Sequence, residues 1–220
     1  METKDINEDN AQGGSFVPQA RKVIVVLENA SLEAARLNSF RHDSKMQLLN
    51  CDEHQSILKR LGRDIADARP DIVHQVDEKE LCGFMCSLLA RVSVNTTRQS
   101  VEQVGSFGVQ LLERGSISGD SEGHKKLLEI LPGPVTQYFP SNVRKFAMSW
   151  NAPRVRLYRH FKNLPEDQTI VVAVGAMAKG PDSFADSYVD EKIGISQYAL
   201  SAAVACGKVC CALEDLWDVM

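Results

Sequence analysis

The sequence predicts an α/β protein with a parallel sheet, and two observations lead to this class. The segments KVIVVLENA and QTIVVAVGA each contain an unbroken apolar run. Such runs are typical of strands that are buried on both faces, as in parallel sheets. Segments with the apolar spacing of helices lie between and after these runs, and alternating strands and helices are the pattern of the α/β class.

Composition places the chain among ordinary globular proteins. Its 220 residues are 44% apolar, enough to bury the core of one large domain or of two small ones. No apolar stretch reaches the roughly 18 residues of a membrane span, and the N-terminus METKDINEDN is acidic and polar, unlike a signal peptide. We therefore expect no membrane partner. The six cysteines lie in apolar surroundings, so we expect reduced thiols and no disulfides.

The chain is expected to begin with a disordered tail. Residues 1–20 are polar and rich in Gly, Asn and Asp, and we separate them from one domain over residues 21–220. The apolar run at residues 23–27 predicts the first buried strand. Residues 51–62 predict a helix, with Asp52 near its N-terminus and Gly62 at its end. Residues 81–94 predict another helix that leads into a short strand.

The second half of the chain contains the other expected elements. Residues 96–124 include a Gly- and Ser-rich stretch, which predicts an exposed loop or insertion. Residues 125–131 predict a helix, and residues 168–176 predict the second buried strand. Residues 199–219 predict a long final helix with small residues on one face: Ala202, Ala203, Ala205 and Gly207. Small residues suit close helix packing, so we expect this face to make the contact of a dimer.

Common nucleotide-binding motifs are not matched. The turn GAMAKG has the glycine spacing of a P-loop, but Gly180 is followed by Pro181 and Asp182 where a P-loop has Lys and Ser or Thr. The first strand is followed by ENASLEAAR, which lacks the glycines of a dinucleotide-binding fingerprint. The sequence also lacks the Gly-x-Ser-x-Gly turn of α/β-hydrolases.

No metal site is expected. Cys206 and Cys210 lie four residues apart on one helix face, but no second Cys or His pair with zinc-ligand spacing accompanies them. Cys51 and His54 are similarly isolated. Helix packing explains the first pair better than metal binding does.

A basic segment, RVRLYRHFK at residues 154–162, is a candidate RNA-binding patch. Its three arginines alternate with apolar residues, and Tyr158 and His160 lie among them. Cations neutralise phosphate while aromatic rings stack on unpaired bases, so this mixture suits single-stranded RNA. A solvated strand edge has the same pattern. The net charge of −4 restricts nucleic-acid binding to such a local patch.

Several segments taken in order carry a resemblance to a known family: KVIVVLENASLE, LLNCDEHQSILKRLGRDIADARPDIVHQ, GPVTQYFP, VVAVGAMAKG and DEKIGISQYALSAAVACGKV. They resemble the ribosome-biogenesis methyltransferases that methylate N1 of a pseudouridine in small-subunit ribosomal RNA. This family belongs to the SPOUT, or trefoil-knot, class. The resemblance implies a SPOUT-type parallel sheet flanked by helices, with a C-terminal trefoil knot.

The resemblance also implies a site for S-adenosyl-L-methionine between two loops of the knot. Gly175 and Gly180 would let the backbone pass close to the cofactor because they have no Cβ. A tight strand-to-loop turn would use glycines in the same way. The other implied cofactor-binding residues are Met148 and the ISQYAL segment: Ile195, Ser196, Gln197, Tyr198, Ala199 and Leu200. No catalytic residue is assigned.

An RNA-contacting arginine is implied in the RPDI segment. Arg69 matches the family's arginine, and Asp71 matches the acid that orients it. A carboxylate paired with a guanidinium fixes a fork that can address phosphate or base. Taken without the resemblance, the same two residues read as a surface ion pair.

The chain also departs from the family's pattern. The family carries a block of a few dozen residues, with RNA-binding arginines, between RPDI-x-HQ and a helix that we align near Cys82, and here His74-Gln75 runs almost directly into LCGFM. Lys179 stands in place of a histidine and Ala199 in place of a proline. We expect a pseudouridine N1-methyltransferase of the nucleus or nucleolus that forms a homodimer and works with pre-ribosomal assembly factors. A non-catalytic assembly factor without much of the RNA-binding surface is the alternative.

Overall fold

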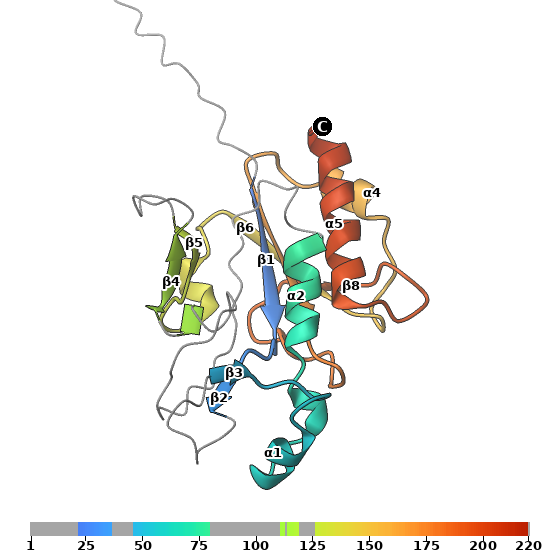
Figure 1. Ribbon diagram of the computed structural model, residues 1–220. Coiled ribbons are helices and arrows are strands. Elements are labelled where there is room, and N and C mark those ends of the chain that lie inside the picture. The colour runs from blue at the N-terminus through green and yellow to red at the C-terminus, as the bar shows by residue number, and fades with distance from the viewer. Residues whose placement is uncertain (1–21, 37–45, 80–110, 113, 119–125, 220) are drawn as a thin grey trace, which may run out of the picture.

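A parallel sheet of four strands forms the centre of the computed structural model (Figure 1). The structure describes residues 22–36, 46–79, 111–112, 114–118 and 126–219. The sheet has the order β1-β7-β6-β8, and all three pairings are parallel. Its strands are β1 (Val23–Glu28), β6 (Val143–Met148), β7 (Thr169–Gly175) and β8 (Glu191–Ile193).

The two strands predicted from their apolar runs are neighbours in this sheet. β1 pairs with β7 along its whole length, from Val23 opposite Ile170 to Glu28 opposite Gly175. All of β1 and the central part of β7 are buried. The sequence does not predict β6 and β8, because their sequences VRKFAM and EKI mix charged and apolar residues.

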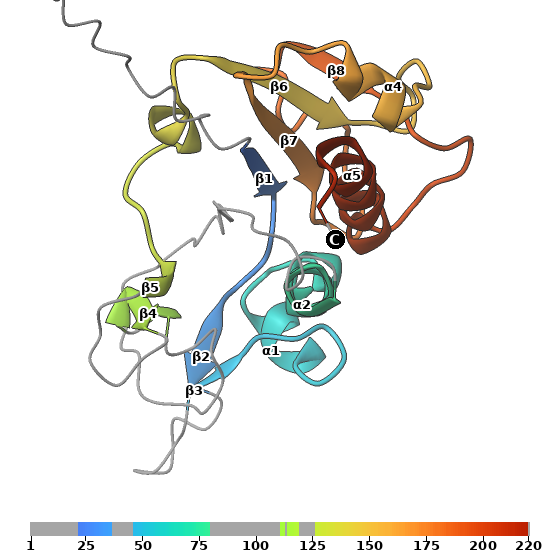
Figure 2. The same cartoon turned by 90° about the horizontal axis from the view of Figure 1, so that it is seen from above.

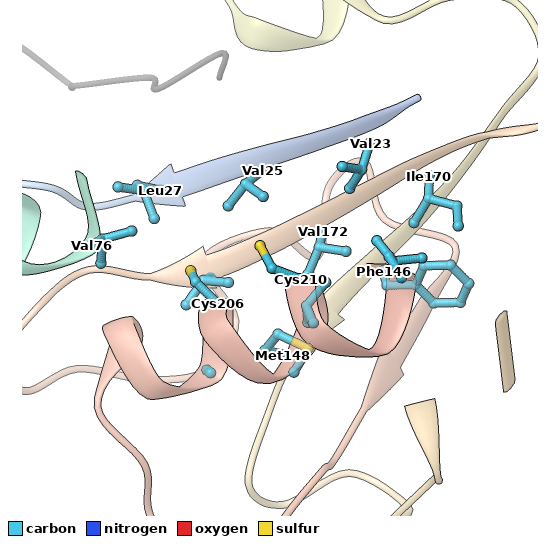
Figure 3. Close-up of a cluster of buried hydrophobic side chains, with 14 of the residues drawn as sticks. Val23, Val25, Leu27, Val76, Phe146, Met148, Ile170, Val172, Cys206 and Cys210 are labelled. Carbon is cyan, nitrogen blue, oxygen red and sulfur yellow. The ribbon is translucent and has the colours of Figure 1, made fainter. Parts of the chain in front are cut away.

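Helices cover one face of the sheet. α2 (Pro70–Lys79), α4 (Leu157–Lys162) and α5 (Ala202–Trp217) lie on this side, with α5 between the other two (Figure 2). The apolar cluster between sheet and helices includes Val25 and Leu27 of β1, Val76 of α2, and Cys206 and Cys210 of α5 (Figure 3). Both cysteines are therefore part of the core.

The opposite face of the sheet is also buried. Ile24 and Val26 of β1 and Val171 and Ala173 of β7 point into a second cluster, together with Val135. This cluster is covered by the 3-10 helix η2 (Val135–Tyr138) and by residues 184–189. Successive residues of a strand face opposite sides, so burial on both sides explains why each predicted strand is continuously apolar.

The small-residue face of α5 points inward. Ala203 and Ala205 are part of the core cluster under the sheet, and Gly207 is buried as well. The sequence-based argument that this face makes the dimer contact is therefore wrong, because small residues here let α5 approach the sheet of its own chain. The helix begins after Ser201, whose hydroxyl accepts a hydrogen bond from the Val204 amide at 3.2 Å.

Two other predicted elements differ from the structure. The helix expected at residues 125–131 is instead strand β5 (Lys126–Glu129), which pairs antiparallel with β4 (Ser116–Ser118). A short apolar run does not distinguish strand from helix, and pairing with β4 decides here. In the basic segment, Leu157–Lys162 form helix α4 and not a strand edge.

The remaining elements lie between β1 and α2 in the chain. β2 (Ala34–Arg36) pairs with β3 (Met46–Leu48). The predicted helix at residues 51–62 is confirmed as α1 (Gln55–Arg60), although His54 and not Asp52 precedes its first turn. Gly62 follows the helix with a φ of 68°, a conformation that favours glycine. The 3-10 helix η1 (Ile65–Asp67) leads into α2.

Some predicted segments lie outside the described residues. These are the tail at residues 1–20, the helix and strand at residues 81–94, and most of the loop at residues 96–124. Within that loop, Leu111 is described and buried, and Ser116–Ser118 form β4. In the described ranges, no helix has the length and apolar character needed to cross a membrane.

Candidate functional site

The loops at the carboxyl ends of the parallel strands form the candidate site. β1 ends at Glu28, β6 at Met148, β7 at Gly175 and β8 at Ile193. All four strands run in the same direction, so these ends share one edge of the sheet. Ligands of open α/β sheets bind at this edge. Both loops that the sequence assigns to the cofactor begin here.

The first of these loops follows β7. A Cβ on Gly175 would lie 3.0 Å from the ring of Phe184, and Gly180 has a φ of 156°, which side-chain-bearing residues rarely adopt. The loop is joined to the end of β1, because the Ala176 amide donates a hydrogen bond to the Glu28 carbonyl at 2.8 Å. Both glycines therefore sit where a larger residue would be crowded or strained.

The second loop follows β8 and leads into α5. Ile195 packs against the core, and the Ser196 hydroxyl accepts a hydrogen bond from the Tyr198 amide at 3.0 Å. Gln197, Tyr198, Ala199 and Leu200 are exposed, and Tyr198 is 70% exposed. The loop thus presents apolar side chains to solvent from a short hydrogen-bonded turn.

Gly194 begins this loop and was not singled out from the sequence. A Cβ at this position would lie 2.6 Å from the Ala152 carbonyl oxygen and 3.1 Å from the Ser149 carbonyl oxygen. The Val155 amide donates to the Gly194 carbonyl at 2.8 Å, and the Gly194 amide donates to the Pro153 carbonyl at 2.9 Å. The loop after β6 therefore holds the backbone at Gly194 on two sides. An isolated glycine beside a strand was the available signal.

A hydrogen bond between two side chains joins the loop after β6 to the loop after β7. The Ser149 hydroxyl donates to the Asp182 carboxylate at 2.5 Å and also accepts from the Asn151 amide at 3.1 Å. The bond from Ser149 lowers the pKa of Asp182, and the charge of Lys192 acts in the same direction against the effect of burial. The two residues are 33 positions apart, so no local pattern in the sequence predicts this hydrogen bond.

Met148, which the resemblance placed near the cofactor, lies at the end of β6. Its side chain is 9% exposed and packs in the cluster between the sheet and α5 (Figure 3). Its side chain therefore belongs to the core, at the end of a strand from which a loop of the site begins. The rest of the predicted cofactor residues are on the loops themselves.

Arg69 and Asp71 form the fork that the sequence led us to expect. The Arg69 Nε donates to one carboxylate oxygen of Asp71 at 2.8 Å, and a terminal nitrogen donates to the other oxygen at 2.6 Å. This bond raises the pKa of Arg69 and lowers the pKa of Asp71. About a third of the Arg69 side-chain surface is exposed, so the side chain is both oriented by Asp71 and accessible to solvent.

An ion pair connects this region with the loop after β7. Lys179 Nζ lies 2.7 Å from a carboxylate oxygen of Asp64, which caps η1 by accepting from the Ala66 amide. The bond to Lys179 lowers the pKa of Asp64. η1 is followed closely by Arg69, so the structure places the predicted cofactor loop beside the segment that carries the predicted RNA contact.

The described residues offer no group of three His, Cys, Asp or Glu side chains that could hold a metal ion. His54 is buried, and its Nδ1 accepts a hydrogen bond from the Asn50 amide at 3.1 Å. Burial raises the pKa of the neighbouring Cys51 thiol, and the adjacent Asp52 raises it further. His54 therefore stabilises a turn, and Cys51 is not an activated thiol.

Comparison with known proteins gives a family and a fold. The model of the EMG1/NEP1 methyltransferase family matches residues 25–76 and 106–214. The matched parts contain Arg69, Asp71 and both loops of the candidate site. Residues 77–105 lie outside the match, so the family pattern resumes at residue 106 and not near Cys82, where the sequence predicted it.

Named relatives match most of the chain. The ribosomal RNA small subunit methyltransferase mra1 of Schizosaccharomyces pombe is 40% identical over 94% of this chain, which spans 61% of that relative's length. Proteins named ribosomal RNA small subunit methyltransferase NEP1 are 39% identical in Candida albicans and 36% in Homo sapiens. The match covers 90% and 91% of this chain, and 80% and 84% of those relatives.

A solved structure shares the fold. It is Archaeoglobus fulgidus Nep1 bound to S-adenosylhomocysteine, which superposes with a TM-score of 0.62 at 15% sequence identity. The superposition covers 91% of this chain and 100% of the other. At this identity the likeness concerns the fold.

Proposed function

Because the chain belongs to the EMG1/NEP1 methyltransferase family, we propose that it transfers a methyl group from S-adenosyl-L-methionine to N1 of a pseudouridine in small-subunit ribosomal RNA. The observation that carries this proposal is the pair of loops at one edge of the sheet. Gly175 and Gly180 lie on one loop, and Ile195 to Leu200 form the other.

The residues at this edge fit an adenosine-containing cofactor. The packing of the loop itself requires glycine at both positions, because a Cβ would meet Phe184 at Gly175 and Met177 at Gly180. The exposed Tyr198 and Leu200 offer apolar contact, and such contact together with backbone hydrogen bonds is how proteins hold small ligands. The A. fulgidus relative with this fold has S-adenosylhomocysteine bound, which is the compound left after methyl transfer.

When bound, S-adenosyl-L-methionine supplies a methyl group on a sulfonium, which is itself the leaving group. The protein then has to bind, align and exclude water. In this chain the Ser149–Asp182 bond and the backbone bonds around Gly194 fix the two loops relative to each other. Arg69, held by Asp71, is the residue that we assign to the RNA.

Titration calorimetry with S-adenosylhomocysteine tests the cofactor site. We expect binding by the wild-type chain and loss of binding in Gly180→Val, because a branched side chain is strained at a φ of 156°. Gly62→Val is the matched control, since Gly62 also has a positive φ but lies after α1 with open space around it. Absence of binding by a folded wild-type chain would exclude this site.

A non-catalytic assembly factor is the second candidate. It is favoured by residues 77–105, which lie outside the family match where the family is expected to carry RNA-binding arginines. Such a protein would keep the fold and bind S-adenosylhomocysteine, but would not transfer methyl groups. An assay with labelled methyl donor separates the two.

The setting of this activity is also part of the proposal. We place the protein in the nucleus or nucleolus, with pre-ribosomal assembly factors as partners and a homodimer as the active form. The exposed Val204 on α5 supports a contact with another chain. Light scattering at micromolar concentration measures the mass, and a tagged chain imaged in cells gives its location.

A further inference from the structure

A cavity beside helix α4 adjoins the site described above. It has a volume of about 440 Å³ and lies between the start of α4 and the outer surface of α5. Five consecutive residues, 155–159, form one wall, and Lys208 and Ala212 of α5 form another. Ile195 completes the lining. Val155, Leu157, Ile195 and Ala212 give it an apolar floor.

Three cations line this cavity: Arg156, Arg159 and Lys208. All three are exposed. In the part of the chain that the structure describes, no carboxylate forms an ion pair with any of them. By contrast, Arg63, Arg69, Arg144, Lys145, Lys179 and Lys192 each have an acidic partner. The cavity is thus a concentration of unneutralised positive charge on a chain with a net charge of −4.

An aromatic ring lies among these cations. Tyr158 lines the cavity and is 41% exposed, and Lys162 Nζ lies 5.7 Å from the centre of its ring. Guanidinium forks match the geometry of phosphate oxygens, and exposed tyrosine rings stack on unpaired bases. The cavity offers both kinds of contact within a few residues.

The cavity adjoins the candidate cofactor site. Ile195 belongs to both, and the backbone of residues 154–155 is bonded to Gly194 through an isolated bridge and the Val155 amide. A polymer that entered the methyl-transfer site from this side would lie in the cavity. A second copy of the chain fits less well, because a two-fold contact centred here would bring the same cations together.

We propose that this basic cavity binds the phosphodiester backbone and an unpaired base of the RNA substrate, next to the nucleotide to be modified. The proposal rests on the function proposed above. It assigns Arg156, Arg159 and Lys208 to phosphate and Tyr158 to a base. Part of the RNA-binding surface is thereby supplied by α4 and α5, on the C-terminal side of the segment 77–105 that the family match omits.

The test uses the full chain and a labelled RNA hairpin with pseudouridine in its unpaired loop. Affinity is measured by fluorescence anisotropy between about 50 and 200 mM salt. For Arg156→Gln combined with Arg159→Gln, we expect weaker binding. The slope of log K against the logarithm of the salt concentration should become shallower by about 1.4, because each single-strand phosphate contact contributes roughly 0.7 to this slope. Tyr158→Leu should weaken binding by at least about fivefold and leave the slope unchanged.

A matched pair controls for charge. Lys59→Gln combined with Arg60→Gln removes two exposed cations from α1, away from the cavity, and should leave the slope near the wild-type value. Equal loss in both pairs, or no loss in the Arg156 and Arg159 pair, would overturn the proposal. A change of molecular mass without a change of RNA affinity would instead identify a contact between copies.

Methyl transfer is measured separately, so that failure of the proposed enzyme activity can be distinguished from failure of the cavity assignment. If the wild-type chain binds the hairpin through the cavity but transfers no methyl group, the proposed enzyme activity fails and the cavity assignment stands. If methyl transfer proceeds and the cavity variants match the wild type in RNA affinity, the cavity assignment fails alone. Calorimetry with S-adenosylhomocysteine verifies that each variant keeps its cofactor site.

Discussion

Glycines allow the loops of the site to approach one another closely. The carbonyl oxygens of Ala152 and Ser149 occupy the space where a Cβ on Gly194 would lie. These are backbone atoms, so they cannot move away as the end of a flexible side chain could. Gly175 and Gly180, by contrast, would first meet the side chains of Phe184 and Met177. Gly194 is therefore the most restrictive of the three glycines.

Gly194→Ala should destabilise the fold by about 1–3 kcal/mol, because the loop after β6 has to shift to admit the methyl group. The same shift should weaken binding of S-adenosylhomocysteine. Urea unfolding and calorimetry measure the two effects. The control, Gly62→Ala, creates backbone strain of about 1 kcal/mol without a clash and should leave ligand binding intact. Unchanged stability and binding in Gly194→Ala would contradict the close approach.

Ser149→Ala removes the hydrogen-bond donor that fixes Asp182. We expect affinity for S-adenosylhomocysteine to fall by about 3- to 10-fold, corresponding to the roughly 0.5–1.5 kcal/mol of one hydrogen bond. Ser183→Ala changes an exposed neighbour in the same loop and should have no effect. Calorimetry on both variants is the measurement, and equal affinities would show that the loops are held in another way.

The pKa of Asp182 predicts a pH dependence. Its folded-state pKa is lowered, chiefly by the bond from Ser149, so the ionised carboxylate stabilises the fold above the ordinary aspartate value of about 3.9. That contribution is lost as the pH falls through the lower folded-state value. In urea unfolding, the stability difference between the wild type and Asp182→Asn should therefore be largest above about pH 5 and shrink below about pH 4. A difference that is constant with pH would contradict this assignment.

At the scale of elements, α5 connects the core to the candidate site. Its inner face, with Ala203, Ala205 and Gly207, packs against the sheet of its own chain. The predicted cofactor loop leads directly into its N-terminus, which Ser201 caps. Its outer face contributes Lys208 to the basic cavity. Movement of this helix would therefore disturb core, cofactor loop and cavity together.

Ala205→Leu tests the inward orientation of α5. The larger side chain would overpack the core, so we expect a loss of about 1–3 kcal/mol in the free energy of unfolding. Val204→Asp is the comparison, because Val204 is 43% exposed one residue earlier. It should leave the unfolding of the monomer nearly unchanged. Urea denaturation and light scattering are run on both. A mass change without a stability loss in Ala205→Leu would show that this face contacts another chain.

At the scale of the whole molecule, most of the fold matches the family model, and one internal segment does not. Apart from Val23 and Ile24, the sheet lies in residues that match the family, as do the two loops and the Arg69 fork, and residues 77–105 do not match. Phosphate contacts contribute affinity through the release of counterions. The sequence predicts that RNA-binding arginines of the family are missing at this segment, and such a chain should bind RNA more weakly than its fold suggests.

Methyl transfer should accordingly be weak at physiological salt and stronger at low salt. Arg69→Ala should reduce it further, because Asp71 orients the Arg69 side chain, which remains partly exposed. The assay uses a labelled methyl donor and a pseudouridine-containing ribosomal RNA hairpin at both salt concentrations. Full turnover at physiological salt that is unaffected by Arg69→Ala would contradict the prediction. No turnover at either salt, with cofactor bound, would favour the assembly factor.

Local sequence was enough to predict the parts that depend on neighbouring residues. The apolar runs of β1 and β7 indicated strands buried on both faces, and α1 and α5 followed from apolar spacing. Arg69 and Asp71 are two residues apart, so their pairing could be expected from RPDI. The cofactor loops were assigned through the resemblance, and their positions at one sheet edge agree with that assignment.

Tertiary structure alone decided the rest, because contacts between distant residues override local preference. Residues 125–131 had the pattern of a helix, yet pairing with β4 makes Lys126–Glu129 a strand. The small residues of α5 were compatible with a partner or with the core, and only the position of the sheet turned them inward. Gly194 against Ala152, Ser149 with Asp182, and Lys208 beside Arg156 are separated by 30 residues or more. No local pattern encodes such pairs, since each depends on where the strand order β1-β7-β6-β8 brings the chain together.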